Sequence, residues 1–307
     1  MRGAQPFPWP IGQWRSHVNG VRIVKLLDLA TSKVVVNWES TLMSVVEAMK
    51  PNGTPYRVPV VDSVGKFRGI INKRRILEVL IGTRGSAIRG KEGAESLLTE
   101  PVFILIDESY QVFQEGAPIK MVLEYMAENF IGHVVIVDQN NNYKGIIEEQ
   151  DILRSFVGTR MKTPVEGLMK RNVVRICPEA TVYEAAKSMV EKRVRRLPVE
   201  AGGILSGILT IGQVVEHVFK QVQIGRLTLE EIEGLSDRVE AVYTREAHSC
   251  LPSTELGEAI GTLMQRNISG MPVTAEDRKI VGIFTRLDAV VALVHSLGGE
   301  KLVELMG

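Results

Sequence analysis

Cysteine is nearly absent from this sequence: Cys177 and Cys250 are the only two among 307 residues. Two cysteines are too few for a disulfide framework or for a zinc site with several cysteine ligands. We interpret both as small buried apolar residues at equivalent strand ends rather than as reactive thiols. A secretory signal is missing as well, because residues 1–14 contain three prolines and no apolar core. We therefore expect a reduced, cytoplasmic protein.

An excess of either charge is also missing. The 37 lysine and arginine residues are balanced by 36 aspartate and glutamate residues, which leaves a formal net charge of +1. A general nucleic-acid-binding protein needs a basic excess on at least one face. Nucleic acid is therefore not an expected partner, although a local basic patch is compatible with this composition. No run of about 18 apolar residues occurs, so no membrane span is predicted.

Signatures of catalysis and of metal binding are not found. The five histidines form no HExxH pattern, and the chain contains neither a G-x-x-x-x-G-K-[ST] phosphate loop nor a G-x-S-x-G nucleophile elbow. His133 is interpreted as structural rather than as a ligand-binding residue. The sequence thus predicts a protein that is not an enzyme and has no metal site.

A short pattern, by contrast, is present four times. A glycine followed by two apolar residues comes nine or ten residues after a proline or valine in an apolar strand. The glycines are Gly69, Gly145, Gly207 and Gly282, and the strand residues are Pro59, Val135, Pro198 and Pro272. Before each strand, apolar residues follow the i, i+3, i+4, i+7 spacing of one helix face. These sets begin at Leu42, Ile119, Val182 and Leu256.

The distances between the repeats indicate a duplicated pair. Gly69 and Gly207 lie 138 residues apart, and Gly145 and Gly282 lie 137 apart. A repeat of about 60 residues buries its helix faces poorly by itself, so pairing is expected. We predict an N-terminal tail (1–21), module one (22–160) with repeats at about 22–82 and 100–158, module two (161–297) with repeats at about 163–218 and 233–297, and a C-terminal tail (298–307).

Each repeat is predicted to be strand–helix–strand–strand–helix (β-α-β-β-α), which gives an α/β (α+β) fold. The predicted first strands are residues 33–37, 102–106, 172–176 and 238–243. The basic triplet that begins at Lys73 is interpreted as a solvated helix start.

The motifs of the third and fourth repeats resemble those of the cystathionine-β-synthase (CBS) domain family. They are PEATVYEAAKSM and LPVE followed by GILT in repeat three, and MPV followed by GIFTRLD in repeat four. The resemblance covers residues 22–295 and implies two Bateman modules, similar to the γ subunit of AMP-activated protein kinase and its prokaryotic relatives. It also implies a non-catalytic regulator that binds AMP, ADP, ATP or S-adenosylmethionine between paired sheets. A homodimer or a regulated protein partner is expected, because helix faces are left apolar after pairing.

The resemblance carries over most completely to repeat four. Its Thr285 and Asp288 match the hydroxyl and carboxylate of the family's motif, which would meet phosphate and ribose, and Arg286 between them could meet phosphate. The facing surface in repeat three would use Met169, Val174 and Val194 against the purine, and Lys170, Arg195 and Arg196 against phosphates. The alternative interpretation is that Asp288 is an ordinary helix cap beside a solvated basic turn.

The other three clefts depart from the motif. Repeat three has Thr210 but Gln213 in place of the acid, opposite Ile268 and Ser269. Repeat two has Asp151 but Glu148 in place of the hydroxyl residue, opposite Tyr56 and Arg57. Glu148 would repel a phosphate unless Arg57 neutralises it, so an uncharged or sulfonium ligand suits this cleft better.

Repeat one has Asn72 and Arg75 in place of both motif residues. Arginine has only donors and cannot accept a hydrogen bond from a ribose hydroxyl. This cleft is therefore expected to be empty or to hold an anion. Two other function classes remain open: an enzyme with an unrecognised site, and a scaffold or nucleic-acid-binding protein with degenerate clefts.

Overall fold

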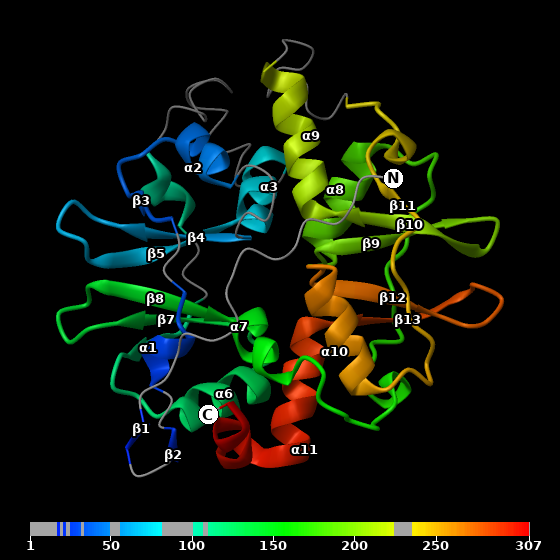
Figure 1. Cartoon of the computed structure of the whole chain (residues 1–307). Coiled ribbons are helices and arrows are strands. Elements are labelled where there is room, and N and C mark those ends of the chain that lie inside the picture. Colours follow the sequence, from blue (N-terminus) through cyan, green and yellow to red (C-terminus); the bar gives the residue numbers. More distant parts are fainter. Residues whose placement is uncertain are drawn as a thin grey trace, which may run out of the picture.

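The computed structural model describes residues 17–18, 21–22, 25–31, 34–49, 56–81, 101–106, 110–223 and 235–306. Four repeats surround a common centre, with repeats one and two on one side of the molecule and repeats three and four on the other (Figure 1). They are preceded by a hairpin of β1 (His17–Val18) and β2 (Val21–Arg22), which begins in the predicted N-terminal tail and ends at the first residue of predicted module one, and by α1 (Leu26–Leu29). Residues 1–16 of that tail lie outside the described residues.

The four repeats follow the same order of elements. Repeat one contains β3 (Val36–Asn37), α2 (Leu42–Ala48), β4 (Arg57–Val61), β5 (Phe67–Asn72) and α3 (Lys73–Ile81). Repeat two contains η1 (Val102–Leu105), β6 (Val112–Gln114), α6 (Ile119–Glu128), β7 (His133–Val137), β8 (Tyr143–Glu148), α7 (Glu149–Leu153) and η2 (Arg154–Phe156). Repeat three contains η3 (Val165–Gly167), α8 (Val182–Glu191), β9 (Arg196–Ala201), β10 (Ile204–Thr210) and α9 (Ile211–Gln223). Repeat four contains η5 (Val239–Ala241), β11 (Thr244–Arg245), α10 (Leu256–Gln265), β12 (Gly270–Thr274), β13 (Ile280–Thr285) and α11 (Arg286–Met306).

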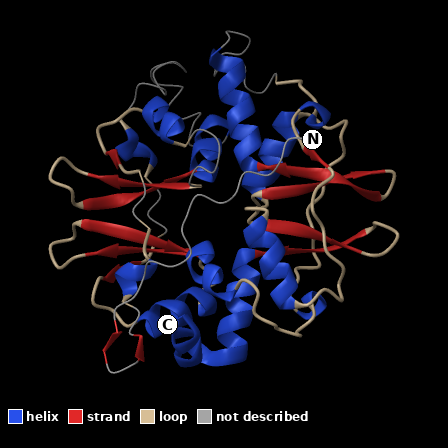
Figure 2. Ribbon diagram, in the orientation of Figure 1, coloured by secondary structure: helices blue, strands red, loops and turns tan. Residues whose placement is uncertain are grey.

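The second and third strands of every repeat form an antiparallel hairpin. In repeats one and two the first strand joins in parallel, as β3 on β4 and β6 on β7. In repeats three and four single parallel bridges, Ile176 to Val199 and Cys250 to Val273, take its place. The sheets of paired repeats are stacked in the middle layer of the molecule (Figure 2), and Phe67, Ile70 and Ile146 are buried between the first pair.

Two of the predicted first strands are wrong. Residues 102–106 contain the 3₁₀ helix η1, and residues 238–243 contain η5. Each of these segments lies at the partner repeat's helix start, where Pro101 bridges to Thr41 and Arg238 to Thr181. Short apolar runs suit a strand and a buried turn equally well, and periodicity does not separate the two. In the other two repeats the predicted strands are shorter than expected, reduced to β3 and to the bridge at Ile176.

The four repeat glycines mark the places where the partner repeat crosses the sheet closely. A Cβ atom would overlap Ile106 at Gly69, Ala30 at Gly145, the Thr244 carbonyl at Gly207 and Met169 at Gly282. In each case the obstructing residue belongs to the other repeat of the same module, or to the segment leading into it. The glycine pattern in the sequence is therefore a consequence of pairing between repeats.

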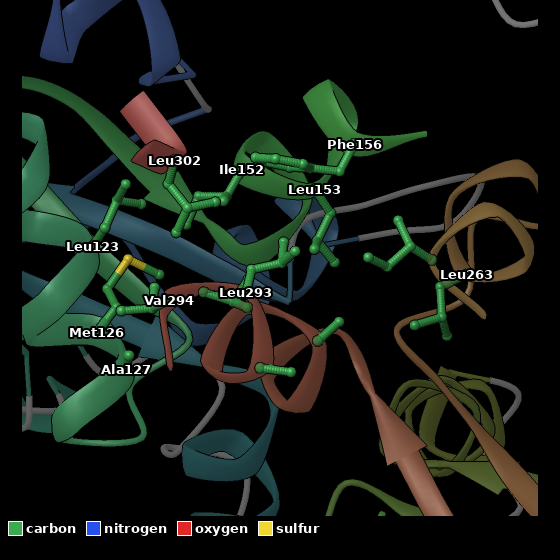
Figure 3. Packing of buried hydrophobic residues seen from close by; sticks show 14 of the residues in the cluster. Leu123, Met126, Ala127, Ile152, Leu153, Phe156, Leu263, Leu293, Val294 and Leu302 are labelled. Carbon is green, nitrogen blue, oxygen red and sulfur yellow. The ribbon is translucent and has the colours of Figure 1, made fainter. Parts of the chain in front are cut away.

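The helices, in contrast, pack between modules. One buried cluster joins α2 and α3 of repeat one to α8 and α9 of repeat three. The other joins α6 and α7 of repeat two to α10 and α11 of repeat four, with Leu123, Met126, Ile152 and Leu293 among its members (Figure 3). Helix faces that motivated the homodimer prediction are thus covered within one chain, which removes that support for it.

The predicted C-terminal tail is wrong for residues 299–306, because they are helical. α11 kinks at Gly298, whose φ of 75° is a conformation that glycine adopts without steric cost. Beyond the kink, Leu302 and Met306 are buried in the cluster of repeats two and four. Lys120 on α6 also forms an ion pair with Glu300 at 2.8 Å. The end of module two therefore packs onto module one.

Candidate functional site

A cavity of about 610 Å³ lies where the four repeats meet, and each repeat contributes to its lining. This volume is in the usual range for small-molecule sites. Among the described residues that line it, six are basic and none is acidic. The basic ones are Arg57, Arg74, Lys170, Arg193, Arg195 and Arg196. The cavity is therefore suited to an anionic ligand.

Most residues predicted for the cleft of repeat four line this cavity. Lys170, Val174, Val194, Arg195, Arg196 and Thr285 do so, and Tyr56 and Arg57, predicted for a different cleft, line the same cavity. The two clefts are thus continuous at the centre of the molecule. Sequence reasoning separated them because it considered each module by itself.

At the helix start of repeat four, the predicted pair Thr285 and Asp288 is in contact, and Asp288 also caps the helix. Asp288 Oδ2 accepts hydrogen bonds from the Thr285 backbone N–H at 2.9 Å and from the Thr285 hydroxyl at 2.6 Å. Its other oxygen, Oδ1, lies 3.6 Å from Lys170 Nζ. Lys170 is held there because its backbone bridges to Ile283 in β13. Asp288 is buried and is not itself part of the lining, so a ligand would reach it past Thr285 and Lys170.

Two predicted site residues have other roles. Met169 packs against Gly282 and belongs to the core rather than to the cavity lining. Arg286 turns away from the cavity: its guanidinium donates to Gln150 Oε1 at 2.8 Å and to the Leu263 carbonyl at 3.2 Å. Assigning Arg286 to phosphate is therefore wrong for this geometry, because the side chain joins repeat four to repeat two.

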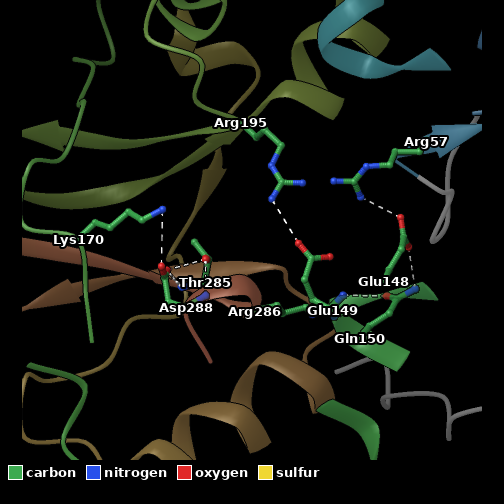
Figure 4. A network of polar contacts seen from close by, with 9 residues as sticks. All are labelled: Arg57, Glu148, Glu149, Gln150, Lys170, Arg195, Thr285, Arg286 and Asp288. Atoms are coloured by element: carbon green, nitrogen blue, oxygen red, sulfur yellow. Dashed lines mark hydrogen bonds and ion pairs between the residues drawn. The ribbon is translucent and has the colours of Figure 1, made fainter. Parts of the chain in front are cut away.

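The helix start of repeat two gathers acidic groups instead (Figure 4). Arg57 Nη1 lies 2.9 Å from Glu148 Oε1, and both side chains are under 10% exposed. Burial disfavours the charge of Arg57, but the carboxylates of Glu148 and Glu149 outweigh it and raise the pKa of the guanidinium. Arg57 thus neutralises Glu148, which is the condition under which a phosphate could approach this helix start. Asp151 Oδ2 caps the same turn by accepting from the Glu148 N–H at 2.8 Å.

Tyr56 brings arginines of both modules together. The guanidinium carbons of Arg57 and Arg195 lie 5.0 Å and 4.9 Å from the centroid of its ring. Both distances are within the range of cation–π attraction. The Arg196 guanidinium nearby forms no hydrogen bond or ion pair with another described residue, and burial together with the charge of Arg195 lowers its pKa to about 9. An anion in the cavity would relieve this concentration of positive charge.

The remaining two helix starts are satisfied internally. In repeat three, Gln213 Oε1 accepts from the Thr210 N–H and hydroxyl, while Nε2 donates to Val242 and Thr244. This leaves the amide poorly placed to bind a ribose. The facing Ile268 packs on the core, and the Ser269 carbonyl accepts from the Arg286 N–H at 3.1 Å.

In repeat one, Asn72 Oδ1 caps the helix by accepting from the Arg75 N–H at 2.8 Å. The Arg75 guanidinium forms an ion pair with Glu78 at 3.0 Å. The interpretation of the basic triplet as solvated is wrong: its residues are half-buried, Arg74 lines the cavity, and burial lowers the pKa of Lys73.

Several residues that line the cavity were not predicted from the sequence. Phe130 and Arg193 follow α6 and α8 at equivalent positions with φ of 52° and 53°. Glycine or asparagine commonly marks such a left-handed residue, and neither is present here, so no sequence signal was available. Tyr110 and Tyr125 complete an aromatic wall. Spacing alone does not show which aromatic residues of repeat two face the centre.

Other chemistry receives no support from the described part of the chain. Its His, Cys, Asp and Glu side chains form no group that could hold a metal ion. Among its helices, none is both long and apolar enough to cross a bilayer. Cys177 is exposed, which corrects its interpretation as buried, whereas burial raises the pKa of Cys250 to about 12.

Comparison with known proteins agrees with the repeat pattern. A sequence profile of the CBS domain family matches residues 28–82, 96–158, 165–220 and 239–295. An uncharacterized 33.4 kDa protein in a ribosomal RNA operon of Thermofilum pendens is 26% identical over 275 residues, which cover 87% of this chain and 89% of that protein. Protein MJ1225 of Methanocaldococcus jannaschii is 26% identical over 278 residues, 87% of this chain and 98% of its own length.

Solved structures share the architecture. The crystal structure of MJ1225, described as a proposed archaeal homolog of γ-AMPK, aligns with a TM-score of 0.78 at 24% identity and covers 88% of this chain and 100% of that one. An uncharacterized conserved protein from Pyrococcus horikoshii aligns with a TM-score of 0.57 at 20% identity, with the same coverage. Because both identities are below 25%, these structures show that the fold is shared, and nothing beyond the fold.

Proposed function

Because the chain belongs to the CBS domain family, we propose that it is a non-catalytic regulatory protein that binds an adenosine-containing ligand at its centre. AMP, ADP and ATP are the leading candidates, and S-adenosylmethionine is the alternative for the Glu148 side of the cavity. The observation that carries this proposal is the central cavity, with six basic and no acidic residues among the described lining.

The helix start of repeat four would hold the nucleoside. Asp288 Oδ1 lies beside Lys170, which lines the cavity, and it is the oxygen that Thr285 does not occupy. A charge-assisted hydrogen bond from a ribose hydroxyl to this oxygen contributes about 1.5–3 kcal/mol. Val174, Val194 and Ile283 supply an apolar wall for the purine, and Arg195 and Arg196 supply charge for phosphate.

Signalling would follow from the position of the site. A ligand that contacts both modules binds more tightly to one arrangement of them than to another, and this difference shifts the conformational equilibrium. A regulated partner protein would read that shift. The partner and a homodimer are both proposed from family membership, and sedimentation velocity across concentrations tests the dimer. Cytoplasmic action is proposed from the two unpaired cysteines.

Isothermal titration calorimetry of the full chain tests the function. We expect AMP, ADP or ATP to bind with micromolar affinity and adenosine to bind more weakly. Absence of heat for every adenine nucleotide and for S-adenosylmethionine at millimolar concentration would reject ligand sensing. It would favour the scaffold alternative, for which the satisfied helix starts of repeats one and three already offer some support.

A further inference from the structure

Three consecutive residues at the start of α7 contact three different repeats. Glu148 pairs with Arg57 of repeat one at 2.9 Å, and Glu149 pairs with Arg195 of repeat three at 3.7 Å. Gln150 accepts a hydrogen bond from Arg286 of repeat four at 2.8 Å. This segment of repeat two, residues 148–150, therefore joins all four repeats (Figure 4).

Two of these arginines also belong to the cavity. Arg57 and Arg195 are in its lining, whereas Glu148 and Glu149 are not, so the carboxylates hold the guanidinium groups from behind the wall. Gly132, another lining residue, makes this possible. A Cβ atom on Gly132 would overlap the Glu149 carboxylate, so the absence of a side chain leaves room for that carboxylate.

We propose that Glu148 and Glu149 determine the ligand charge that the cavity accepts, acting as an internal anion that competes with ligand phosphates for Arg57 and Arg195. A phosphate that approaches either guanidinium must share it with a carboxylate that is already paired. The two carboxylates also repel added negative charge, because each lies next to an arginine of the cavity lining. The penalty grows with each phosphate, so the cavity favours ligands of low charge, such as a monophosphate, over triphosphates.

The charges around the cavity agree with this assignment. Arg57 and Arg195 are paired with carboxylates, Arg74 lies 3.4 Å from Glu78, and Lys170 lies 3.6 Å from Asp288. Arg193 and Arg196 are the two lining cations that form no ion pair with a described acid; Arg193 is exposed and Arg196 is half-buried. Two such cations, one of them exposed, match the charge of a monophosphate better than that of a triphosphate. This inference depends on the cavity of the proposed function but not on recognition of adenosine.

Glu149→Gln is the test, because it removes the charge with almost no change in shape. Calorimetry at fixed ionic strength would compare inorganic tripolyphosphate with inorganic phosphate on the full chain. We expect Glu149→Gln to raise tripolyphosphate affinity roughly five- to fiftyfold, in the range of typical couplings between sites, and phosphate affinity by less. Glu166→Gln is the matched control, since it removes one charge from an exposed pair with Arg171, and it should change neither affinity.

A second variant tests whether the effect comes from the position of the Glu149 carboxylate and not from one particular substitution. Gly132→Ala should displace the Glu149 carboxylate and raise tripolyphosphate affinity in the same direction. Equal tripolyphosphate affinity in wild type, Glu149→Gln and Glu166→Gln, or no binding by any of them, would overturn the inference. A gain in Glu149→Gln without any adenine-nucleotide binding would support it while rejecting the proposed function. Unchanged tripolyphosphate affinity in Glu149→Gln, together with AMP binding, would reject this inference and support the proposed function.

Discussion

At the start of α11 in repeat four, the Asp288 carboxylate caps the turn; at the start of α3 in repeat one, the Asn72 amide oxygen caps it. The two turns hold equivalent places after their sheet hairpins. Repeat four presents a carboxylate with one oxygen directed to Lys170, whereas repeat one presents Arg75, which is paired with Glu78. The same backbone geometry therefore supports opposite charges at the position where the family's motif has its acid.

The comparison shows that capping the helix and binding a ligand are separate roles of this turn. Helix capping needs only an acceptor within three residues, and aspartate, asparagine and glutamine all provide one here. Ligand binding needs an additional oxygen that the cap does not use. Only a carboxylate offers this without losing the cap, which is why replacement of the acid changes the chemistry and leaves the fold in place.

The largest effect is expected from Asp288→Ala. It removes the ribose acceptor of repeat four, so AMP and ATP affinity should fall about tenfold to several hundredfold in calorimetry. The lost cap costs about 1 kcal/mol, so thermal unfolding should remain cooperative. Asp288→Asn keeps an acceptor for the cap and isolates the effect of charge. Wild-type affinity in Asp288→Ala would contradict the assignment.

A stability comparison tests the crossing points of the same two repeats. Gly69 has a φ of 152° and faces the branched Ile106, whereas Gly282 faces the flexible Met169 side chain. We expect Gly69→Ala to lower the free energy of unfolding by about 3 kcal/mol and Gly282→Ala by about 1 kcal/mol, measured in urea.

Gly261→Ala is the control for that pair, because nothing lies within 4 Å of a Cβ there. Its replacement inside α10 should stabilise the protein by about 0.5–1 kcal/mol. Equal losses at Gly69 and Gly261 would show that the partner repeat does not constrain the glycine.

Arg195→Ala examines the basic edge opposite repeat four. Removal of its charge should weaken ATP and ADP by about tenfold and adenosine by no more than about twofold, because only the phosphates are assigned to it. Arg171→Ala removes an exposed arginine that does not line the cavity, and it should change neither nucleotide affinity nor adenosine affinity. An equal loss for adenosine and ATP would assign Arg195 to the nucleoside through its stacking on Tyr56.

The smallest effect is expected at Arg75. Arg75→Ala should leave AMP affinity within about twofold of wild type, since this side chain has no acceptor for a ribose. A crystal soaked with AMP or ATP should show no ribose at this helix start. A ribose held beside Arg75 would remove the distinction between repeats four and one, whereas a bound phosphate or sulfate would preserve it.

Much of the fold could be predicted because its signals are local and are repeated four times. Helix faces, hairpins and repeat glycines all follow from spacing within one repeat. The first strands at 102–106 and 238–243 were wrong because their conformation depends on the partner repeat's helix start, which no local pattern reports. The helical residues 299–306 were missed because burial of Leu302 and Met306 needs α6 of the other module.

The sequence by itself determined which residues cap each helix and which repeat keeps the Thr285 and Asp288 pair, because these interactions span three residues. Only the tertiary structure decided that Arg57 and Arg195 from different modules meet at Tyr56 and at residues 148–150. It also directed Arg286 away from the cavity and toward Gln150. Long arginine side chains reach several possible partners, and the packing of helices between modules selects among them.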